Sequence, residues 1–400
     1  MSNEQSILVV DDSSTYRDIV AHELRQEGYL VSTARNGKKA LDILKTEQFN
    51  FIITDLDMPE VDGYGLIKEI AGLSWRPGVI LMTGHAEKAL HSAEQLAIAY
   101  SINLLATLPK PIPVEKVLSA LTDFVRSRSD EAGVSDSILS ETEFMRGLMT
   151  DGLVPVYQPR VDAKTLKVTG VEVFARWRSI SGGLMGAHSV LTLASEKGYM
   201  DVLTYRMLEL AVEQCGEWLS QGIEMPISLN LNAENLRKSD FSDIVSGLLD
   251  QHNVPPEMVT LEVGEADMLI DERKLLEEMG RLHLRGLGLA LDDFGTGFGS
   301  LMRLHKIPFS EIIIDRGFLD TALRDKVAFT ILESVVDLAH KLDIKAASCG
   351  VSDAQTHALT KKLNFDTLQG YILGKPMLPN DFLSWLSTLN EGCVHLEPEG

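Results

Sequence analysis

The sequence predicts an α/β protein built from two consecutive units, a doubly wound parallel sheet followed by a TIM-like (β/α) barrel. At 400 residues the chain is longer than one ordinary domain of roughly 150 residues. Short apolar strands alternate with segments of helical period along both halves, which is typical of proteins with parallel sheets. Continuous apolar runs such as ILVV and FIIT favour strands that are buried on both faces.

The first 125 residues contain four strand-like segments, and each of them ends in polar residues. Stretches of helical period such as STYRDIVAHELRQEG and NGKKALDILKTEQ lie between them. This alternation, in units of about 20–30 residues, predicts a doubly wound parallel sheet over residues 1–125. The four segments are SILVVDD (6–12), NFIITDLD (50–57), PGVILMTG (77–84) and NLLATLPK (103–110).

The second unit is predicted to follow a linker. Residues 126–141 lose the periodicity and are rich in Ser, Asp and Gly, so they are interpreted as that linker. The alternation resumes on a larger scale over residues 142–390, which predicts the barrel, and residues 391–400 are expected to form a loose tail. The strand-like segments of the barrel are LVPVYQP, KVTGVEVFARW, MPISLNLN, MVTLEVGE, GLGLALDDFG, SEIIIDRG, IKAASCG and DTLQGYILGKP.

The composition argues against several classes of protein. A formal net charge of −21 gives no general attraction to nucleic acid or to an anionic membrane, and no segment is left over for a DNA-binding helix-turn-helix. No apolar run approaches the ~18 residues of a membrane span, and the N-terminus lacks the basic region of a secretory signal. Three widely spaced cysteines, Cys215, Cys349 and Cys393, favour a reducing cytoplasm over a disulfide framework.

Acidic residues follow two predicted strands of the first unit. Asp11 and Asp12 come after the first strand, and Asp55 ends the second. Since the carboxyl ends of such strands meet at one edge of the sheet, the three carboxylates would repel one another without a cation, and hard oxygen ligands suit Mg²⁺. Thr83 and Lys110 follow the next two strands and could hold the oxygens of a phosphoryl group. The pattern therefore predicts an aspartate that accepts phosphate beside Mg²⁺.

The segments VVDD and TDLDMPEVDG, the Thr83-Gly84 pair and the Lys110-Pro111 step together resemble the receiver domain of two-component response regulators, over roughly residues 5–125. The resemblance implies a sensor histidine kinase or a phosphotransfer protein as the phosphate source. Position 107 is Thr107, where receivers often have an aromatic that swings inward on phosphorylation. By resemblance Asp55 is the phosphoacceptor, Asp11, Asp12 and the Asp57 carbonyl join it at Mg²⁺, and Thr83 and Lys110 sense the phosphoryl group.

Polar residues also gather at the ends of the barrel strands, where the mouth of a parallel barrel lies. They are Glu172, Asn230, Glu262, Glu265, Asp292 and Asp293. Carboxylates together with an amide form a hard-oxygen site for one or two Mg²⁺ or Mn²⁺ ions. Two such ions ~4 Å apart would suit the attack of water on a phosphodiester.

These residues resemble the EAL domain of cyclic di-GMP phosphodiesterases, over about residues 140–388. The matching segments are YQP (157–159), GVEVFARW (170–177), NLN (230–232), LEVGE (261–265), LDDFGTGFGS (291–300), IDR (314–316) and LQGYILGKP (368–376). The resemblance implies that Glu172, Asn230, Glu262, Asp292 and Asp293 are metal ligands. It also implies that Gln158, Arg176 and Gln369 contact the nucleotide and that Glu265 steadies the DDFGTG loop.

The chain departs from the family at positions that carry the chemistry. The family lysine that positions the attacking water is Ile313 here, and the glutamate expected to act as general base is Cys349. A second family glutamate is Ser352. Loss of an acid–base group usually lowers a rate by ~10²–10⁴-fold, and loss of an electrostatic stabiliser by ~10²–10³-fold. Cys349 is interpreted as a small buried residue rather than as a redox switch.

The sequence therefore predicts a phosphorylation-controlled regulator whose EAL barrel is degenerate and catalytically inactive. Output would pass through cyclic di-GMP binding, through contact with another signalling protein or a second copy of the chain, or through both. The alternative is an active phosphodiesterase that converts cyclic di-GMP to linear pGpG. No GGDEF-like segment is present, so synthesis of the nucleotide is not expected.

Overall fold

The structure is a computed structural model, and it divides the chain into two compact units, residues 1–131 and 132–400. Most of the expected linker (126–141), Pro111, the glycine-rich residues 296–300 and the tail beyond 394 lie outside the described residues. The residues that the structure describes are 5–73, 75, 77–84, 93, 96–97, 100, 102–110, 116–122, 139–178, 183–232, 235–238, 240–265, 272–295, 304 and 306–394.

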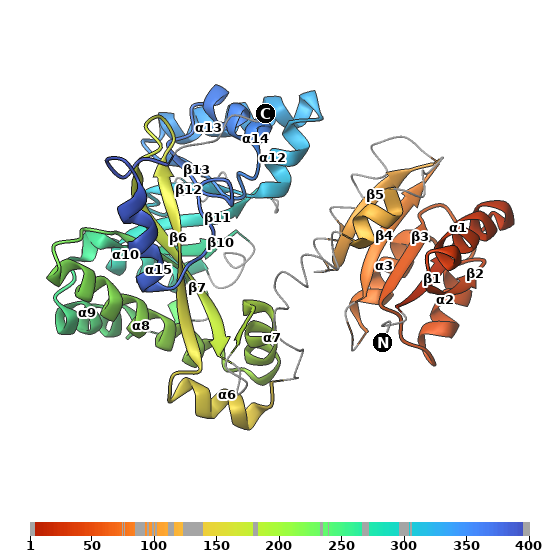
Figure 1. The fold of residues 1–400 in the computed structure, drawn as a ribbon, viewed down its shortest axis with the longest axis horizontal. Helices are drawn as coiled ribbons and strands as arrows, with labels where there is room; N and C mark the ends of the chain where they lie inside the picture. Colours follow the sequence, from red (N-terminus) through yellow and green to blue (C-terminus); the bar gives the residue numbers. More distant parts are fainter. Residues whose placement is uncertain are drawn as a thin grey trace. The chain divides into compact units, whose positions relative to one another are not determined.

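The first unit contains a five-stranded sheet in the order β2-β1-β3-β4-β5 (Figure 1). All neighbouring strands pair in parallel, which confirms the predicted fold class. β2 was not expected from the sequence, because this edge strand begins with an exposed Leu30 and contains polar residues. The strands are β1 (Ser6–Val10), β2 (Leu30–Ala34), β3 (Phe51–Asp55), β4 (Gly78–Thr83) and β5 (Asn103–Pro109).

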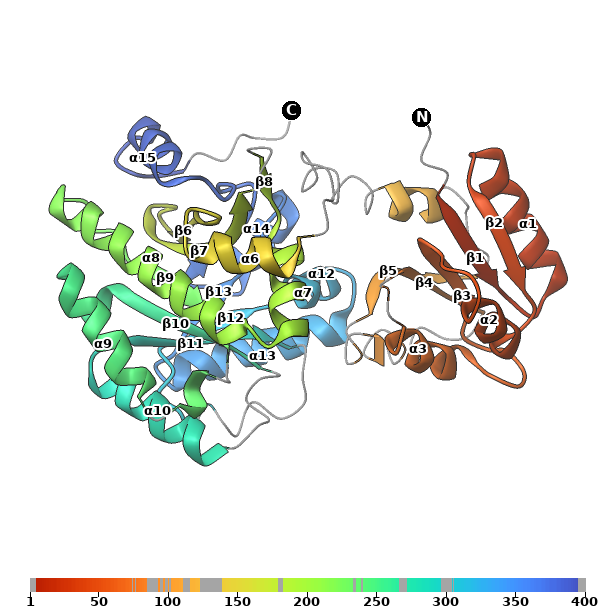
Figure 2. The ribbon, with the colours of Figure 1, turned by 90° about the horizontal axis from the view of Figure 1, so that it is seen from below.

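Alternate residues of each strand in this sheet face opposite hydrophobic cores. Leu8 of β1 packs with residues of α2 (Gly37–Leu44) and α3 (Gly63–Ala71). Ile7 packs on the other face with α1 (Ser14–Gln26) and with the helical residues 116–122 (Figure 2). Both faces of the sheet are thus covered, which explains the continuous apolar runs of its central strands.

The second unit is a barrel. Its strands follow one another in the order β6-β14-β13-β12-β11-β10-β9-β7, and β6 also pairs with β7, which closes the ring among the described residues. This confirms the predicted barrel. The ring strands are β6 (Leu153–Asp162), β7 (Val168–Arg178), β9 (Ile227–Asn230), β10 (Val259–Gly264), β11 (Gly288–Phe294), β12 (Glu311–Ile314), β13 (Lys345–Ser348) and β14 (Thr367–Leu368). A short strand β8 (Leu184–Met185) pairs with β7 outside the ring.

One strand of the ring departs from the all-parallel arrangement of a TIM barrel. β6 runs antiparallel to both of its neighbours, β7 and β14. The cause is local, since only residues 163–167 separate β6 from β7. A parallel crossover would need a dozen or more residues. Because β6 is reversed, the beginning of this strand, not its end, lies at the mouth of the barrel.

Helices surround the barrel (Figures 1 and 2). Phe144 of α6 is buried and stacks on Trp177 of β7, with ring centroids 5.4 Å apart. None of the helices within the described ranges is both long and apolar enough to cross a membrane. The helices are α6 (Glu141–Leu148), α7 (Ala187–Lys197), α8 (Met200–Ser220), α9 (Phe241–His252), α10 (Glu272–Leu284), α12 (Arg316–Ala322), α13 (Lys326–Lys341), α14 (Ala354–Lys362) and α15 (Pro379–Thr388).

Candidate functional site

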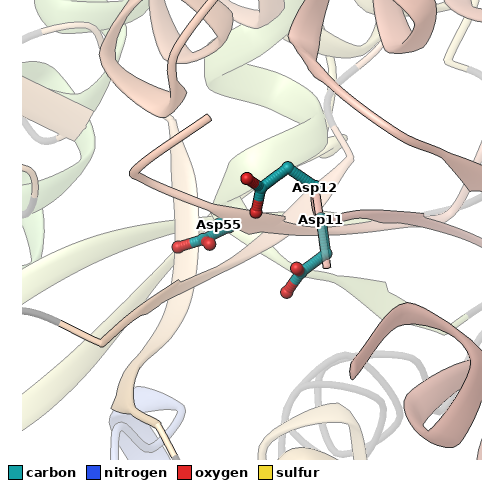
Figure 3. A group of neighbouring side chains, drawn as sticks. All are labelled: Asp11, Asp12 and Asp55. Carbon is teal, nitrogen blue, oxygen red and sulfur yellow. The ribbon is translucent and has the colours of Figure 1, made fainter. Parts of the chain in front are cut away.

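Three carboxylates converge at the carboxyl edge of the sheet in the first unit. Asp11 and Asp12 directly follow β1, and Asp55 ends the neighbouring strand β3 (Figure 3). One oxygen from each of the three side chains lies within 4.8 Å of the others. Asp11 and Asp55 are buried, whereas Asp12 is exposed. This is the edge at which the strand order of an open α/β sheet reverses and ligands bind.

Lys110 supplies the positive charge of this site. Its Nζ atom lies 2.7 Å from Asp11 Oδ2 and 2.6 Å from Asp55 Oδ2. Burial raises the pKa of Asp55 above its ordinary value, and the hydrogen bond from Lys110 limits the rise. Burial of the ammonium opposes its charge, but the hydrogen bonds to Asp11 and Asp55 outweigh burial and raise the pKa of Lys110. The Lys110 ammonium is therefore held in its charged form.

The remaining residues predicted for the first site lie around Asp55. Its Oδ1 atom accepts hydrogen bonds from the backbone N–H groups of Leu56 at 2.7 Å and Asp57 at 3.4 Å. Thr83 is buried at the end of β4, and its backbone carbonyl oxygen accepts a hydrogen bond from the backbone N–H of Lys110 at 2.7 Å. The structure thus brings the predicted residues together. Three carboxylates with one exposed member fit a divalent cation, since hard oxygen donors are what such ions prefer.

The mouth of the barrel contains a cavity of about 350 Å³. Most of the predicted barrel residues line it, including the three positions that the sequence predicts to be degenerate. Phe174, Arg316 and Tyr371 also line it, although the sequence reasoning assigned them no role, and Arg316 is the one basic residue among the described residues that do so. The predicted residues in the lining are Gln158, Glu172, Asn230, Asp292, Asp293, Ile313, Cys349, Ser352 and Gln369.

A chain of hydrogen bonds orients the polar side of this cavity. The Gln369 Nε2 atom donates to Glu172 Oε2 at 2.7 Å and to Gln158 Oε1 at 3.0 Å. Asn230 Nδ2 donates to Glu172 Oε1 at 2.9 Å, and Gln158 Nε2 donates to the Gly374 carbonyl at 3.0 Å. Glu172 is thereby fixed at both oxygens by amide groups from two other strands or strand ends.

Arg160 was missed by the sequence reasoning. It is buried in β6, two residues after Gln158 on the same inward face. Its guanidinium donates to Glu311 Oε2 and to Ser228 Oγ, and its Nη1 atom lies 3.5 Å from Glu262 Oε1. A signal for Arg160 was present in the sequence. Residues two apart on a strand point to the same face, which places Arg160 inward with Gln158.

Both carboxylate oxygens of Glu262 are buried, and neither has a hydrogen-bond partner of normal geometry among the described residues. A buried carboxylate left in this state is costly unless a cation or a proton compensates it. Arg160 is 3.5 Å from one of its oxygens but makes no hydrogen bond to it. This carboxylate, together with Glu172 and Asp292, fits a divalent cation. The three carboxylates do not reach the mutual 4.8 Å spacing of the first site among the residues described.

Burial and mutual repulsion favour the protonated form of these acids. Burial, followed by the charge of Asp292, raises the pKa of Glu172 to about 7. Burial, followed by the charges of Glu262 and Asp293, raises the pKa of Asp292 to about 8. Burial and the charge of Glu172 also raise the pKa of Glu262. One guanidinium does not compensate this number of buried acids.

The other half of the barrel interior is apolar. Ile313 packs against Ala290 and Ala347 of the neighbouring strands, and Cys349 packs against the same cluster. The Cys349 thiol donates to the Ile314 carbonyl with an S···O distance of 3.2 Å, and burial raises its pKa. Ser352 Oγ is 3.4 Å from Asp353 Oδ2 at the start of α14. The two positions at which the sequence predicts the loss of a lysine and a glutamate therefore hold an apolar side chain and a thiol whose pKa is raised.

Three predicted residues, Glu262, Arg176 and Glu265, do not line the cavity. The Arg176 guanidinium donates to the carbonyl of its neighbour Ala175 at 3.0 Å. Glu265, at the end of β10, accepts the backbone N–H of Gly295 at 3.0 Å. The hydrogen bond from Gly295 to Glu265 is the contact expected of a glutamate that steadies the DDFGTG loop, because Gly295 is the first glycine of that loop. Both roles stay predictions.

The two sites and the two folds define a receiver–EAL response regulator. Residues 7–122 match the response regulator receiver domain family, and residues 141–376, more than half of the chain, match the EAL domain family. The chain therefore belongs to the EAL domain family and has a receiver domain in front of its EAL domain.

Curated relatives share this arrangement to different extents. The cyclic di-GMP phosphodiesterase RocR of Pseudomonas aeruginosa is 27% identical over 392 residues, which cover 96% of this chain and 99% of RocR. The bifunctional diguanylate cyclase/cyclic di-GMP phosphodiesterase MucR of Pseudomonas aeruginosa is 34% identical over 234 residues, or 58% of this chain. The alignment spans only 34% of the length of MucR.

Solved structures resemble the barrel. The PaMucR phosphodiesterase in complex with c-di-GMP has a TM-score of 0.57 and 31% identity, and the match covers 60% of this chain and 98% of that chain. The Xanthomonas citri FimX EAL domain in complex with c-diGMP has a TM-score of 0.56 and 19% identity, over 59% of this chain and 93% of that chain. At that identity the second match shows the fold alone.

Proposed function

We propose that this chain is a phosphorylation-controlled regulator whose EAL barrel binds rather than hydrolyses. Asp55 accepts the phosphoryl group from a sensor histidine kinase or a phosphotransfer protein. The barrel then passes the signal on by binding cyclic di-GMP, by contacting another signalling protein or a second copy of the chain, or by both.

The support for the receiver half is the group around Asp55. The carboxylate is held at one oxygen by the Leu56 and Asp57 backbone N–H groups and at the other by Lys110. These contacts orient the Asp55 carboxylate, which is the nucleophile. The Lys110 ammonium lies where negative charge develops during phosphoryl transfer. A divalent cation bound by Asp11, Asp12, Asp55 and the Asp57 carbonyl would neutralise phosphate oxygens. Thr83 and Lys110 are the residues that we expect to contact the phosphoryl group.

The support for an inactive barrel is one observation, the apolar half of its interior. Ile313 and Cys349 line the mouth cavity at the positions where the family has its lysine and its general base. Ile313 packs on Ala290 and Ala347, and the one basic residue in the described lining is Arg316 rather than a lysine. Lys345, a nearby amine, is exposed at the opposite end of β13 from Cys349. The acids that remain in the described lining, Glu172, Asp292 and Asp293, are the expected metal ligands and not a substitute for the missing base.

The support for retained binding is the polar half. Glu172, Asn230, Glu262, Asp292 and Asp293 remain as oxygen donors, and a bound Mg²⁺ or Mn²⁺ ion would supply charge to hold phosphate. The buried Glu262 carboxylate, which makes no hydrogen bond and has only Arg160 at 3.5 Å, is the feature that fits such an ion best. Gln158 and Gln369 are held for nucleotide contacts by the hydrogen bonds between them. We include Arg176 in this set as a nucleotide contact that would have to turn away from Ala175.

The second candidate function is an active cyclic di-GMP phosphodiesterase. It is favoured by the match to RocR, which spans nearly the whole of both chains and is named as such an enzyme. In that case Glu172, Asp292 or a rearranged neighbour would have to act as the base. The two candidates make opposite predictions for the product pGpG.

One experiment separates them. Calorimetric titration of the full chain with cyclic di-GMP, with and without Mg²⁺, measures binding, and chromatography of the same mixtures detects pGpG. Binding without product supports the proposal. More pGpG than enzyme after an overnight incubation would refute the inactive barrel, and neither binding nor product would leave protein contacts as the output.

A further inference from the structure

An aromatic side chain of the receiver unit lies against the ammonium of Lys110. The Lys110 Nζ atom is 5.0 Å from the centroid of the Tyr16 ring. Tyr16 belongs to the first turn of α1, and its backbone N–H donates to the N-cap side chain of Ser13 at 3.5 Å. In the same turn Arg17 donates to the Asp11 carbonyl at 2.7 Å. The turn that carries the ring is therefore fastened to the loop that carries the carboxylates.

The ring completes the surroundings of the ammonium. Two of its contacts are the carboxylates of Asp11 and Asp55, and the side chain of Lys110 is only 12% exposed. A cation close to the face of an aromatic ring is attracted by the ring quadrupole, and the attraction grows as water is excluded. The lysine side chain is flexible and ends in a compact charge. The Tyr16 ring, as a third contact, therefore restricts where the ammonium can lie.

We propose that Tyr16 is a positioning residue, whose ring holds the Lys110 ammonium in place for phosphoryl transfer to Asp55. The inference rests on the proposed role of Asp55. With acetyl phosphate as donor, an Asp55 carboxylate oxygen forms a bond to phosphorus. The bond from phosphorus to the acetyl oxygen breaks, and acetate leaves with the electron pair.

During this step Lys110 has to exchange partners. The Asp55 oxygen that it contacts becomes part of an acyl phosphate, and the negative charge moves to the phosphoryl oxygens. The ring of Tyr16 takes no part in the bond changes, so it is a contact that can persist through them. It keeps the ammonium within reach of the new oxygens.

The test compares two substitutions in the full chain. We expect Tyr16→Leu to slow the labelling of Asp55 by acetyl phosphate about 3- to 10-fold, because the aromatic face is lost. Tyr16→Phe keeps that face and loses only the hydroxyl, so its rate should stay within about twofold of the wild type. Tyr29→Leu is the matched control, since it removes a partly buried tyrosine that follows the end of α1 and packs against the core there.

A second measurement does not depend on activity. In the wild type the ring current of Tyr16 should shift the Lys110 ε-proton resonances upfield. The shift should persist in Tyr16→Phe and vanish in Tyr16→Leu.

A wild-type rate in Tyr16→Leu, an equally slow Tyr16→Phe, or no ring-current shift in the wild type would each overturn the inference. If the wild type is not labelled at all, the proposed role of Asp55 fails instead, and the resonance shift still decides whether Tyr16 holds Lys110.

Discussion

At the edge of the receiver sheet, a buried lysine reaches two carboxylates at 2.6 and 2.7 Å. At the mouth of the barrel, the position expected to hold a lysine is occupied by Ile313, which packs on two alanines. Both sites are rich in acids, and both contain oxygen donors suited to divalent cations. They differ in the cation: Lys110 contacts two acids of the receiver site, whereas the one basic residue in the described lining of the mouth cavity is Arg316, with no lysine beside the acids.

Besides Arg316 at the mouth, the barrel has a buried cation in its interior. Arg160 contacts Glu311 and Glu262 below the mouth, and it is not part of the lining of the mouth cavity. It stabilises the interior of the barrel rather than a bound phosphate. The comparison therefore separates a lysine placed for chemistry from an arginine placed for folding.

The largest effect should come from removing the receiver nucleophile. We expect Asp55→Asn to abolish labelling by acetyl phosphate or beryllofluoride, because the amide cannot form the acyl phosphate. Intact-mass spectrometry should find one phosphate on the wild type in the presence of Mg²⁺ and none on the variant. Equal labelling of the two proteins would show that another residue accepts the phosphate.

The second prediction concerns the barrel. With Mn²⁺ overnight, the wild type should turn over cyclic di-GMP at background. The base expected at position 349 usually contributes ~10²–10⁴-fold, and the charge expected at position 313 usually contributes ~10²–10³-fold. The contributions need not multiply. Chromatography of pGpG measures the outcome.

The double variant Ile313→Lys with Cys349→Glu sharpens the test. It returns a charge and a base to the apolar half, and we expect measurable pGpG from it. The single variant Ile313→Lys is the control, because it restores charge without a base. If the wild type already forms many equivalents of pGpG per enzyme, the barrel is active and the proposed difference between the two sites is wrong.

The third prediction tests whether Arg160 acts in folding. Arg160→Met leaves the buried Glu311 and Glu262 without their cation, and breaking a buried pair in this way usually costs about 3–5 kcal/mol. Urea unfolding followed by tryptophan fluorescence should show that loss. Replacing Glu311 by Leu in the same variant should recover part of it, since one unpaired charge is removed.

The matched control for Arg160 is a pair on the surface. Lys197 lies 3.2 Å from Glu141, and both side chains are nearly half exposed. Lys197→Met should lower the free energy of unfolding far less than Arg160→Met does, because exposed ion pairs contribute little. Similar losses in the two variants would mean that burial of Arg160 is not what matters.

The smallest expected effect is the coupling between the two units. Phosphorylation can bias the output only by stabilising one receiver conformation over another. Couplings of this kind are usually ~1–3 kcal/mol, or ~5–150-fold in affinity, and Thr107 in place of an aromatic relay favours the low end. Sedimentation of apo and beryllofluoride-treated protein should reveal altered self-association, and a pull-down with wild type and Asp55→Asn should reveal altered partners. If neither self-association nor the set of partners changes, phosphorylation of the receiver is not coupled to the output of the barrel.

Much of this protein could be predicted from the sequence, because its signals are local. Apolar runs with polar ends identified β1 and β3 and the strands of the barrel, and the carboxylates at those ends identified both sites. The exposed edge strand β2 gave no such signal, since Leu30 faces solvent and polar residues interrupt the run. The reversal of β6 also had to come from the structure, although the short connection to β7 explains it.

Only the tertiary structure decided which groups meet across long separations. Glu311 contacts Arg160 from 151 residues away, because closure of the barrel brings β12 opposite β6. Alternation along a strand indicates which side chains point inward, but it does not say which of them face each other. The same holds for Tyr16 and Lys110, which belong to different elements of the receiver and meet at one edge of the sheet. The sequence by itself determined the kinds of residues at each site, and packing determined which charges are paired.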